Sequence, residues 1–212
     1  GITASFLVRE NHFWSKVISP HEGDMIERHI RAHGIDLRMN TNLLEIVPDE
    51  NGKAASVLTD HGDSIPCQMV GLTAGVRPNI DFLKNSDLDI NRGILVDQYL
   101  ATNLPDVYAI GDCAELHSPL AHRHAIEAVW YVGRMMGETL AQSLTGEPTA
   151  YTPGHWFNSA KFFDIEYQTY GQISTEATLE ENHFCWKHPT ENCMVRLAYR
   201  PESRLFLGIN TF

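Results

Sequence analysis

The residues with the clearest capacity for chemistry are Gly111 and Asp112, which follow the apolar run at residues 107–110. A strand that ends on Gly-Asp presents a carboxylate at the carboxyl edge of a sheet, where open α/β sheets bind nucleotides. Gly111 lets a ligand approach the backbone closely, and Asp112 can accept hydrogen bonds from ligand hydroxyl groups. The alternative is an ordinary buried strand ended by a turn. The spacing from Thr102 to Gly-Asp favours a ligand site.

The opening of the chain predicts a strand–helix–strand unit, which is the building block of a parallel sheet. Ser19 suits the N-cap of a helix, and Glu22 completes a capping box with it. Gly34 predicts the end of this helix as a left-handed cap. Short buried-type strands are predicted on either side, at residues 3–8 and 35–39.

Residues 43–67 predict a small antiparallel meander, because turn signals separate three strand-like runs. Asn51-Gly52 is a strong hairpin signal, and a second tight turn is predicted at residues 61–63. Two further buried strands are predicted at residues 69–73 and 94–97.

A long helix is predicted from about His124 to Leu144, with Gly133 and Gly137 on one face. Each glycine costs roughly 1 kcal/mol of helix stability, so we interpret the pair as a surface for close packing. Aromatic residues become dense beyond a composition shift at residues 145–148. Four strand-like segments of an antiparallel sheet are predicted there, at residues 165–170, 183–187, 194–199 and 205–209.

The composition is that of a globular protein, with 43% apolar and 20% charged residues among 212. A net charge of -11 without a basic block argues against nucleic acid or an anionic membrane surface as a partner. We expect no membrane span, because no apolar run reaches about 20 residues. We also expect no signal peptide at the start of the chain. Four scattered cysteines without a C-x-x-C pair suit a reducing compartment, so we expect a cytoplasmic location.

The Thr102–Asp112 motif, with the turn at residues 74–79 before it and the long helix after it, resembles a known family. It is similar to the C-terminal half of the FAD-dependent pyridine nucleotide-disulfide oxidoreductases, which include NADH oxidases, CoA-disulfide reductases and ferredoxin reductases. The resemblance covers nearly the whole chain. It implies an α/β fold, α+β overall, with partial Rossmann-like segments and a C-terminal antiparallel sheet of the dimerisation type. The implied divisions are an NAD(P)H-binding part at 1–76, an FAD-binding part at 77–147 and an interface domain at 148–212.

The resemblance also implies roles for individual residues. Gly111 and Asp112 would hold the ribityl chain of FAD. The helix N-terminus at His124 and Ala125 would face the pyrimidine edge of the flavin, where its positive end favours negative charge in the reduced state. Gly75 lies where family members bring the backbone near the nicotinamide nucleotide, although a role in turn geometry alone is an equal alternative.

Arg9 and Glu10 follow the first predicted strand, where the family binds the adenosine ribose of the nicotinamide nucleotide. Glu10 suits the ribose of NADH, whereas Arg9 suits the 2′-phosphate of NADPH. The alternative is a pair of solvated charges at a strand end. The sequence leaves both questions open.

The implied parent enzyme passes hydride from NAD(P)H to FAD, and electrons onward to a disulfide, oxygen or a partner protein. The family forms homodimers through its C-terminal domain. Its two Gly-x-Gly-x-x-Gly fingerprints and its redox cysteine are absent here, so we expect a fragment that binds FAD poorly and is inactive by itself. The alternative function is a flavin-free dimerisation or scaffold module, which the missing fingerprints and the dense aromatic residues favour.

His29 and His33 lie four residues apart on one face of the first predicted helix, a spacing that can bind a metal. No third ligand is evident from the sequence. We therefore interpret the pair as a half-exposed helix face and expect no metal site.

Overall fold

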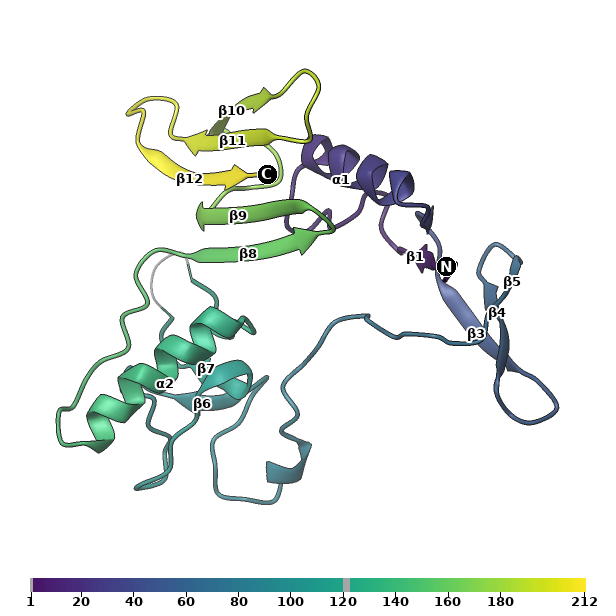
Figure 1. Ribbon diagram of the computed structural model, residues 1–212. Helices are drawn as coiled ribbons and strands as arrows, with labels where there is room; N and C mark the ends of the chain where they lie inside the picture. The colour runs from purple at the N-terminus through teal and green to yellow at the C-terminus, as the bar shows by residue number, and fades with distance from the viewer. Residues whose placement is uncertain (1, 120–122) are drawn as a thin grey trace. The chain divides into compact units, whose positions relative to one another are not determined.

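The computed structural model describes residues 2–119 and 123–212 and shows a mixed α/β protein. The chain forms two compact units (Figure 1). The first combines Gly1–Thr73 with Ser159–Phe212, and the second is Ala74–Asn158. Within the described ranges, no helix is long and apolar enough to cross a membrane.

The first unit opens with the strand–helix–strand arrangement that the sequence predicts. Strand β1 (Ser5–Leu7) pairs in parallel with β2 (Asp36–Arg38), and helix α1 (Pro20–Ala32) connects them. Phe6 is aligned with Leu37 in this pair. β1 is shorter and more exposed than predicted, because only one neighbouring strand covers it among the described residues.

The ends of α1 confirm the predicted helix signals. The Ser19 side chain accepts a hydrogen bond from the Glu22 N–H, and the Glu22 carboxylate accepts one from the Ser19 N–H at 2.7 Å. Gly34 follows the helix with φ +78°, a left-handed conformation that glycine adopts without strain.

The predicted meander is confirmed as a three-stranded antiparallel sheet. It contains β3 (Leu43–Pro48), β4 (Ala54–Thr59) and β5 (Ser64–Pro66), in that order. Gly52 turns the chain between the first two strands with φ +75°.

The aromatic-rich end of the chain forms a five-stranded sheet, in the order β10-β11-β12-β9-β8. The four predicted strands are present, and the sequence analysis missed the edge strand β8. The strands are β8 (Phe157–Phe162), β9 (Ile165–Gly171), β10 (Asn182–Lys187), β11 (Met194–Tyr199) and β12 (Phe206–Thr211).

Helix α1 packs against one face of this sheet and forms the core of the first unit. Ile26 and Ile30 of the helix are buried in one cluster with Tyr167 of β9. Trp14 completes the cluster, with its ring edge-on to Tyr167 and to Phe162 at centroid distances of 5.5 and 5.2 Å. Segments far apart in the sequence therefore share one core.

A buried ion pair also joins α1 to the sheet. The Glu22 carboxylate is completely buried and lies 2.9 Å from Nη2 of Arg196 on β11. Asn210 of β12 donates a hydrogen bond from Nδ2 to the other Glu22 oxygen, also at 2.9 Å. Arg196 donates from Nη1 to the Ser174 carbonyl. The residue that closes the capping box is thus also the polar centre of the helix–sheet contact.

The second unit is built around two parallel strands and one helix. β6 (Ile94–Val96) pairs with β7 (Ala114–Leu116), and α2 (Trp130–Leu144) contributes Val132 and Met136 to their common core. The predicted strand at residues 94–97 is thereby confirmed.

Two predicted buried strands do not form. Residues 69–73 have no regular structure, and Met69 is 86% exposed. Residues 107–110 make only an isolated bridge, from Tyr108 to Ala101. An apolar run becomes a strand only when a neighbour satisfies its N–H and C=O groups, and none of the described strands lies beside these two runs.

Gly93 allows β6 and β7 to approach each other, so we expect Gly93→Ala to destabilise the second unit. An alanine Cβ would lie 2.8 Å from the Cys113 carbonyl oxygen and 3.0 Å from the Glu115 Cβ. Overpacking of this kind costs about 1–3 kcal/mol. Chemical denaturation measures the loss. Gly71→Ala is the control, because nothing lies within 4 Å of its added methyl group. Equal stability of the two variants would contradict the steric role.

Candidate functional site

The Gly111–Asp112 motif forms a turn that leads into β7. Residues Gly111–Cys113 make one 3₁₀ turn, and Gly111 has φ +75° with nothing within 4 Å of an added Cβ. The Asp112 side chain is exposed and contacts no hydrogen-bond donor or cation within the described ranges. The turn therefore presents open backbone and a carboxylate that is available to a ligand.

Helix α2 lies directly against this turn. A Cβ added to Gly133 would lie 3.6 Å from the Gly111 Cα, and one added to Gly137 would lie 3.9 Å from the Ile110 side chain. The Gly111 N–H points to the Met136 sulfur at 3.3 Å. The predicted close-packing face of the helix is confirmed, and its contact is the Gly-Asp turn.

The predicted start of this helix is wrong by six residues. α2 begins at Trp130, so His124 and Ala125 lie in the extended segment before it. The Ala125 carbonyl accepts a hydrogen bond from the Leu116 N–H at 2.9 Å, and the His124 N–H donates to Glu127 at 3.3 Å. These contacts tie the segment to β7 instead of to a helix. The N-terminus of α2 has no side-chain cap.

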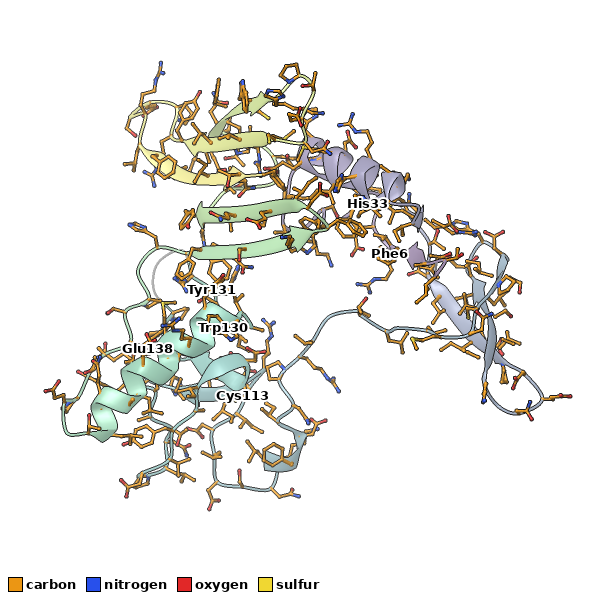
Figure 2. All side chains as sticks on the ribbon, in the orientation of Figure 1. Phe6, His33, Cys113, Trp130, Tyr131 and Glu138 are labelled. Atoms are coloured by element: carbon orange, nitrogen blue, oxygen red, sulfur yellow. The ribbon has the colours of Figure 1, made fainter. Side chains whose placement is uncertain are left out.

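Aromatic side chains that the sequence analysis missed lie at the first turn of α2. Figure 2 labels Trp130 and Tyr131 there, and Cys113 beside the Gly-Asp turn. Trp130 is 69% exposed, and the Arg134 guanidinium lies 5.7 Å from its ring centroid. Tyr131 packs on Phe157 at 4.9 Å. In the sequence, the adjacent residues Trp130 and Tyr131 are the feature that could have indicated the first turn of α2.

A buried ion pair fixes the segment that precedes α2. Arg123 Nε lies 2.7 Å from one Glu127 oxygen, Nη2 lies 2.5 Å from the other, and both side chains are almost fully buried. Arg123 also donates to the Gly154 carbonyl and lies 5.2 Å from the Trp156 ring centroid. Burial raises the pKa of the neighbouring Tyr151 to about 12, although the Arg123 charge opposes the rise. Arg123 therefore stabilises the fold of this segment.

Gly75 lies in the irregular stretch that opens the second unit. It has φ +96°, it is exposed, and nothing lies within 4 Å of an added Cβ. The conformation favours glycine and leaves the backbone open to a ligand.

Arg9 and Glu10 follow β1 in the first unit, as predicted. The Glu10 carboxylate is about one-third exposed and lies 3.7 Å from Arg9 Nη2 and 3.6 Å from Lys16 Nζ. The Glu10 carbonyl accepts a hydrogen bond from the Asn40 N–H, which follows β2. A partly exposed carboxylate thus stands at the carboxyl end of the parallel pair.

The structure therefore groups some predicted site residues and leaves others separate. Gly111 and Asp112 form one turn under α2, and Ala125 joins the same unit through β7. Arg9 and Glu10 form a pair of their own in the first unit. All four cysteines, Cys67, Cys113, Cys185 and Cys193, are free.

These features suit a dinucleotide with a polyhydroxyl chain. The Gly111 backbone is open, the Asp112 carboxylate has no protein partner within the described ranges, and the N-terminus of α2 has no side-chain cap. A carboxylate accepts hydrogen bonds from hydroxyl groups, and an uncapped helix N-terminus favours negative charge nearby.

Known proteins are similar to this chain in sequence. A profile of the pyridine nucleotide-disulphide oxidoreductase family matches residues 3–137. The 5,5'-dehydrodivanillate O-demethylase ferredoxin reductase subunit of Sphingobium sp. is 33% identical over 74% of this chain and 38% of its own length. The rubredoxin-NAD(+) reductase of Acinetobacter baylyi is 31% identical over 63% of this chain and 33% of its own length.

A solved structure confirms the fold class. The ferredoxin reductase for the CYP199A2 system from Rhodopseudomonas palustris superposes with a TM-score of 0.85 at 21% identity, over 100% of this chain and 50% of its own. The chain spans between a third and a half of the length of these relatives. FAD and NAD(P)H, the cofactors expected from the sequence, are the cofactors of the matching family. The chain belongs to the pyridine nucleotide-disulphide oxidoreductase family.

Proposed function

We propose that this chain is part of an NADH-dependent flavoprotein reductase that passes electrons to a small redox protein. The observation that carries the proposal is the Gly111–Asp112 turn, which is open to a ligand on one side and packed against α2 on the other. FAD, when bound, would supply the chemistry of hydride acceptance from NADH and of electron release to an acceptor.

The residues of this chain position the flavin. Asp112 accepts hydrogen bonds from the ribityl hydroxyl groups, and the open backbone at Gly111 lets the chain of the cofactor pass close by. The N-terminus of α2, at Trp130, places its positive end near the flavin and favours the charge of the reduced ring.

The nicotinamide nucleotide binds through the residues that follow β1. Glu10 holds the adenosine ribose, and its attraction for Arg9 draws that guanidinium away from a 2′-phosphate. We therefore favour NADH over NADPH. The name of the Acinetobacter relative, which includes NAD(+), supports the same choice.

A protein acceptor is favoured over a disulfide or oxygen. The two relatives are named for ferredoxin and rubredoxin reduction. The apolar run at 69–73 is largely exposed here, and it is a surface for further strands of a longer reductase.

The test is a spectroscopic titration of the protein expressed from its complete gene. We expect a yellow protein whose flavin absorbance is bleached by one equivalent of NADH without oxygen, and much more slowly by NADPH. Added ferredoxin or rubredoxin should restore the colour. A colourless protein would instead support the flavin-free scaffold function. Bleaching without transfer to either redox protein would remove the proposed acceptor class.

The same protein is proposed to act as a homodimer in the cytoplasm. Phe184, Leu197, Ile209 and Tyr170 occupy one row across four strands of the C-terminal sheet, on the face opposite α1. Exposed aromatic side chains on such a row suit contact with a second copy. Light scattering of the wild type and of Phe184→Glu measures the oligomeric state. The proposed location rests on the four free thiols, which suit a reducing compartment.

A further inference from the structure

A cluster of metal-ligating side chains lies at the C-terminal end of α1, apart from the proposed flavin turn. It consists of His29 from the helix, His33 from the C-cap position that follows it, and Asp164 from the turn between β8 and β9. Figure 2 labels His33 at this end of α1. Their ligating atoms lie within 4.8 Å of one another. His29 Nε2 is 2.5 Å from Asp164 Oδ1, and His33 Nε2 is 3.8 Å from the same oxygen. The third ligand, Asp164, lies 131 positions after His33, so the sequence alone did not reveal it.

The fold holds the three side chains in these positions. The two histidines are one helical turn apart, so their rings share one face of α1. Phe163 has φ +59° in the tight turn that presents Asp164. The His33 ring is stacked on Phe163 with a centroid distance of 4.1 Å and an interplanar angle of 6°. The turn that supplies the carboxylate therefore also orients an imidazole.

The second nitrogen of each imidazole has a partner that suits metal binding at Nε2. His33 Nδ1 donates to the His29 carbonyl at 2.9 Å, which leaves the Nε2 lone pair available. His29 Nδ1 lies 3.1 Å from the Asn192 side-chain amide. When a metal replaces the proton on His29 Nε2, this amide can present its oxygen to the Nδ1–H group.

The cluster is buried on one side and open on the other. His29 is 7% exposed, whereas the Asp164 side chain is 78% exposed. Ligands of a tetrahedral zinc ion lie about 3.3 Å apart, a spacing that falls between the two observed nitrogen–oxygen distances. A small shift of the exposed Asp164 side chain can bring its carboxylate to this spacing from the imidazole nitrogens.

We propose that His29, His33 and Asp164 bind a divalent cation of the zinc class, with water as the fourth ligand. Two imidazoles and one carboxylate are ligands of the borderline type that zinc prefers, and three protein ligands with one open position are a common zinc arrangement. The ion ties α1 to the β8–β9 turn and so joins the two sequence segments of the first unit. This role is independent of the flavin and of electron transfer.

The test is a zinc titration of the metal-stripped 212-residue chain against a chromophoric chelator, with a thermal unfolding scan of each sample. We expect one tight site and a higher midpoint temperature with zinc. His33→Ala and Asp164→Asn should each weaken the Kd at least tenfold and abolish the thermal shift. Both side chains are partly exposed, so these variants should fold.

Two control variants make the result specific. His155→Ala removes an exposed histidine from the other unit and should bind zinc like the wild type. His12→Ala disrupts a second group of possible ligands, His12 with Asp24 and Glu27, and should also retain the site. The proposal is overturned if His33→Ala binds zinc as tightly as the wild type, or if His12→Ala is the variant that loses it. Cobalt(II) that gives only the weak spectrum of an octahedral ion would also overturn it.

Discussion

Replacing Arg196 by methionine is expected to lower the free energy of unfolding of the first unit by about 3–5 kcal/mol. Glu22 has no exposed surface, and Arg196 is the only cation that the described ranges place beside it. Methionine fills much of the same volume but leaves the carboxylate buried without a counter-charge. Urea denaturation followed by tryptophan fluorescence and circular dichroism measures the change, because Trp14 lies in the core of this unit.

Two comparisons separate the ion pair from a general loss of packing. Arg200→Met alters an exposed arginine next to β11 and should change the stability by about 0.5 kcal/mol or less. The double change Glu22→Gln with Arg196→Met leaves no buried charge, so it should cost clearly less than the sum of the two single changes. An Arg196→Met protein as stable as the Arg200→Met protein would show that the buried pair contributes little.

The second large effect is expected at the flavin turn. Asp112→Ala in the protein expressed from its complete gene should lower FAD affinity by roughly ten- to a hundred-fold. A hydrogen bond to a charged group contributes about 1.5–3 kcal/mol, and each 1.4 kcal/mol is a factor of ten in Kd. The ratio of flavin to protein absorbance after gel filtration measures retention, and fluorescence of released flavin measures the Kd.

Matched variants identify the carboxylate as the cause. Asp87→Ala removes another exposed aspartate of the same unit, whose side chain makes no hydrogen bond with the described residues, and should retain the flavin. Asp112→Asn keeps a hydrogen-bond acceptor and should fall between the alanine variant and the wild type. Asp112 is exposed, so denaturation curves of all three should coincide. Undiminished flavin content in Asp112→Ala would remove Asp112 from the cofactor site.

The errors of the sequence analysis have local physical reasons. The stretch from His124 to Val129 has a composition that a helix tolerates, but its backbone is bonded elsewhere. The Ala125 carbonyl accepts from Leu116, and the Glu127 carbonyl accepts from Val129. A helix starting at His124 would have to break both of these hydrogen bonds. Such competition between local propensity and tertiary contacts cannot be read from the sequence of one segment.

The sequence by itself determined the elements whose signals lie within a few residues. Ser19 and Glu22 specified the start of α1, and Asn51-Gly52 specified the hairpin of the meander, because capping and turn geometry depend on immediate neighbours. The Thr102–Asp112 motif likewise indicated the family, since its spacing is local.

Only the tertiary structure decided which distant groups share an environment. Glu22 was predicted as a capping residue, and the fold made it the buried partner of Asn210, 188 positions away. His29 was predicted to lie on a half-exposed helix face, and the fold placed Asp164 against it, 135 positions away. These pairings depend on how α1 packs on the C-terminal sheet. That packing is set by the summed burial of Ile26, Ile30 and Tyr167 and not by any short pattern.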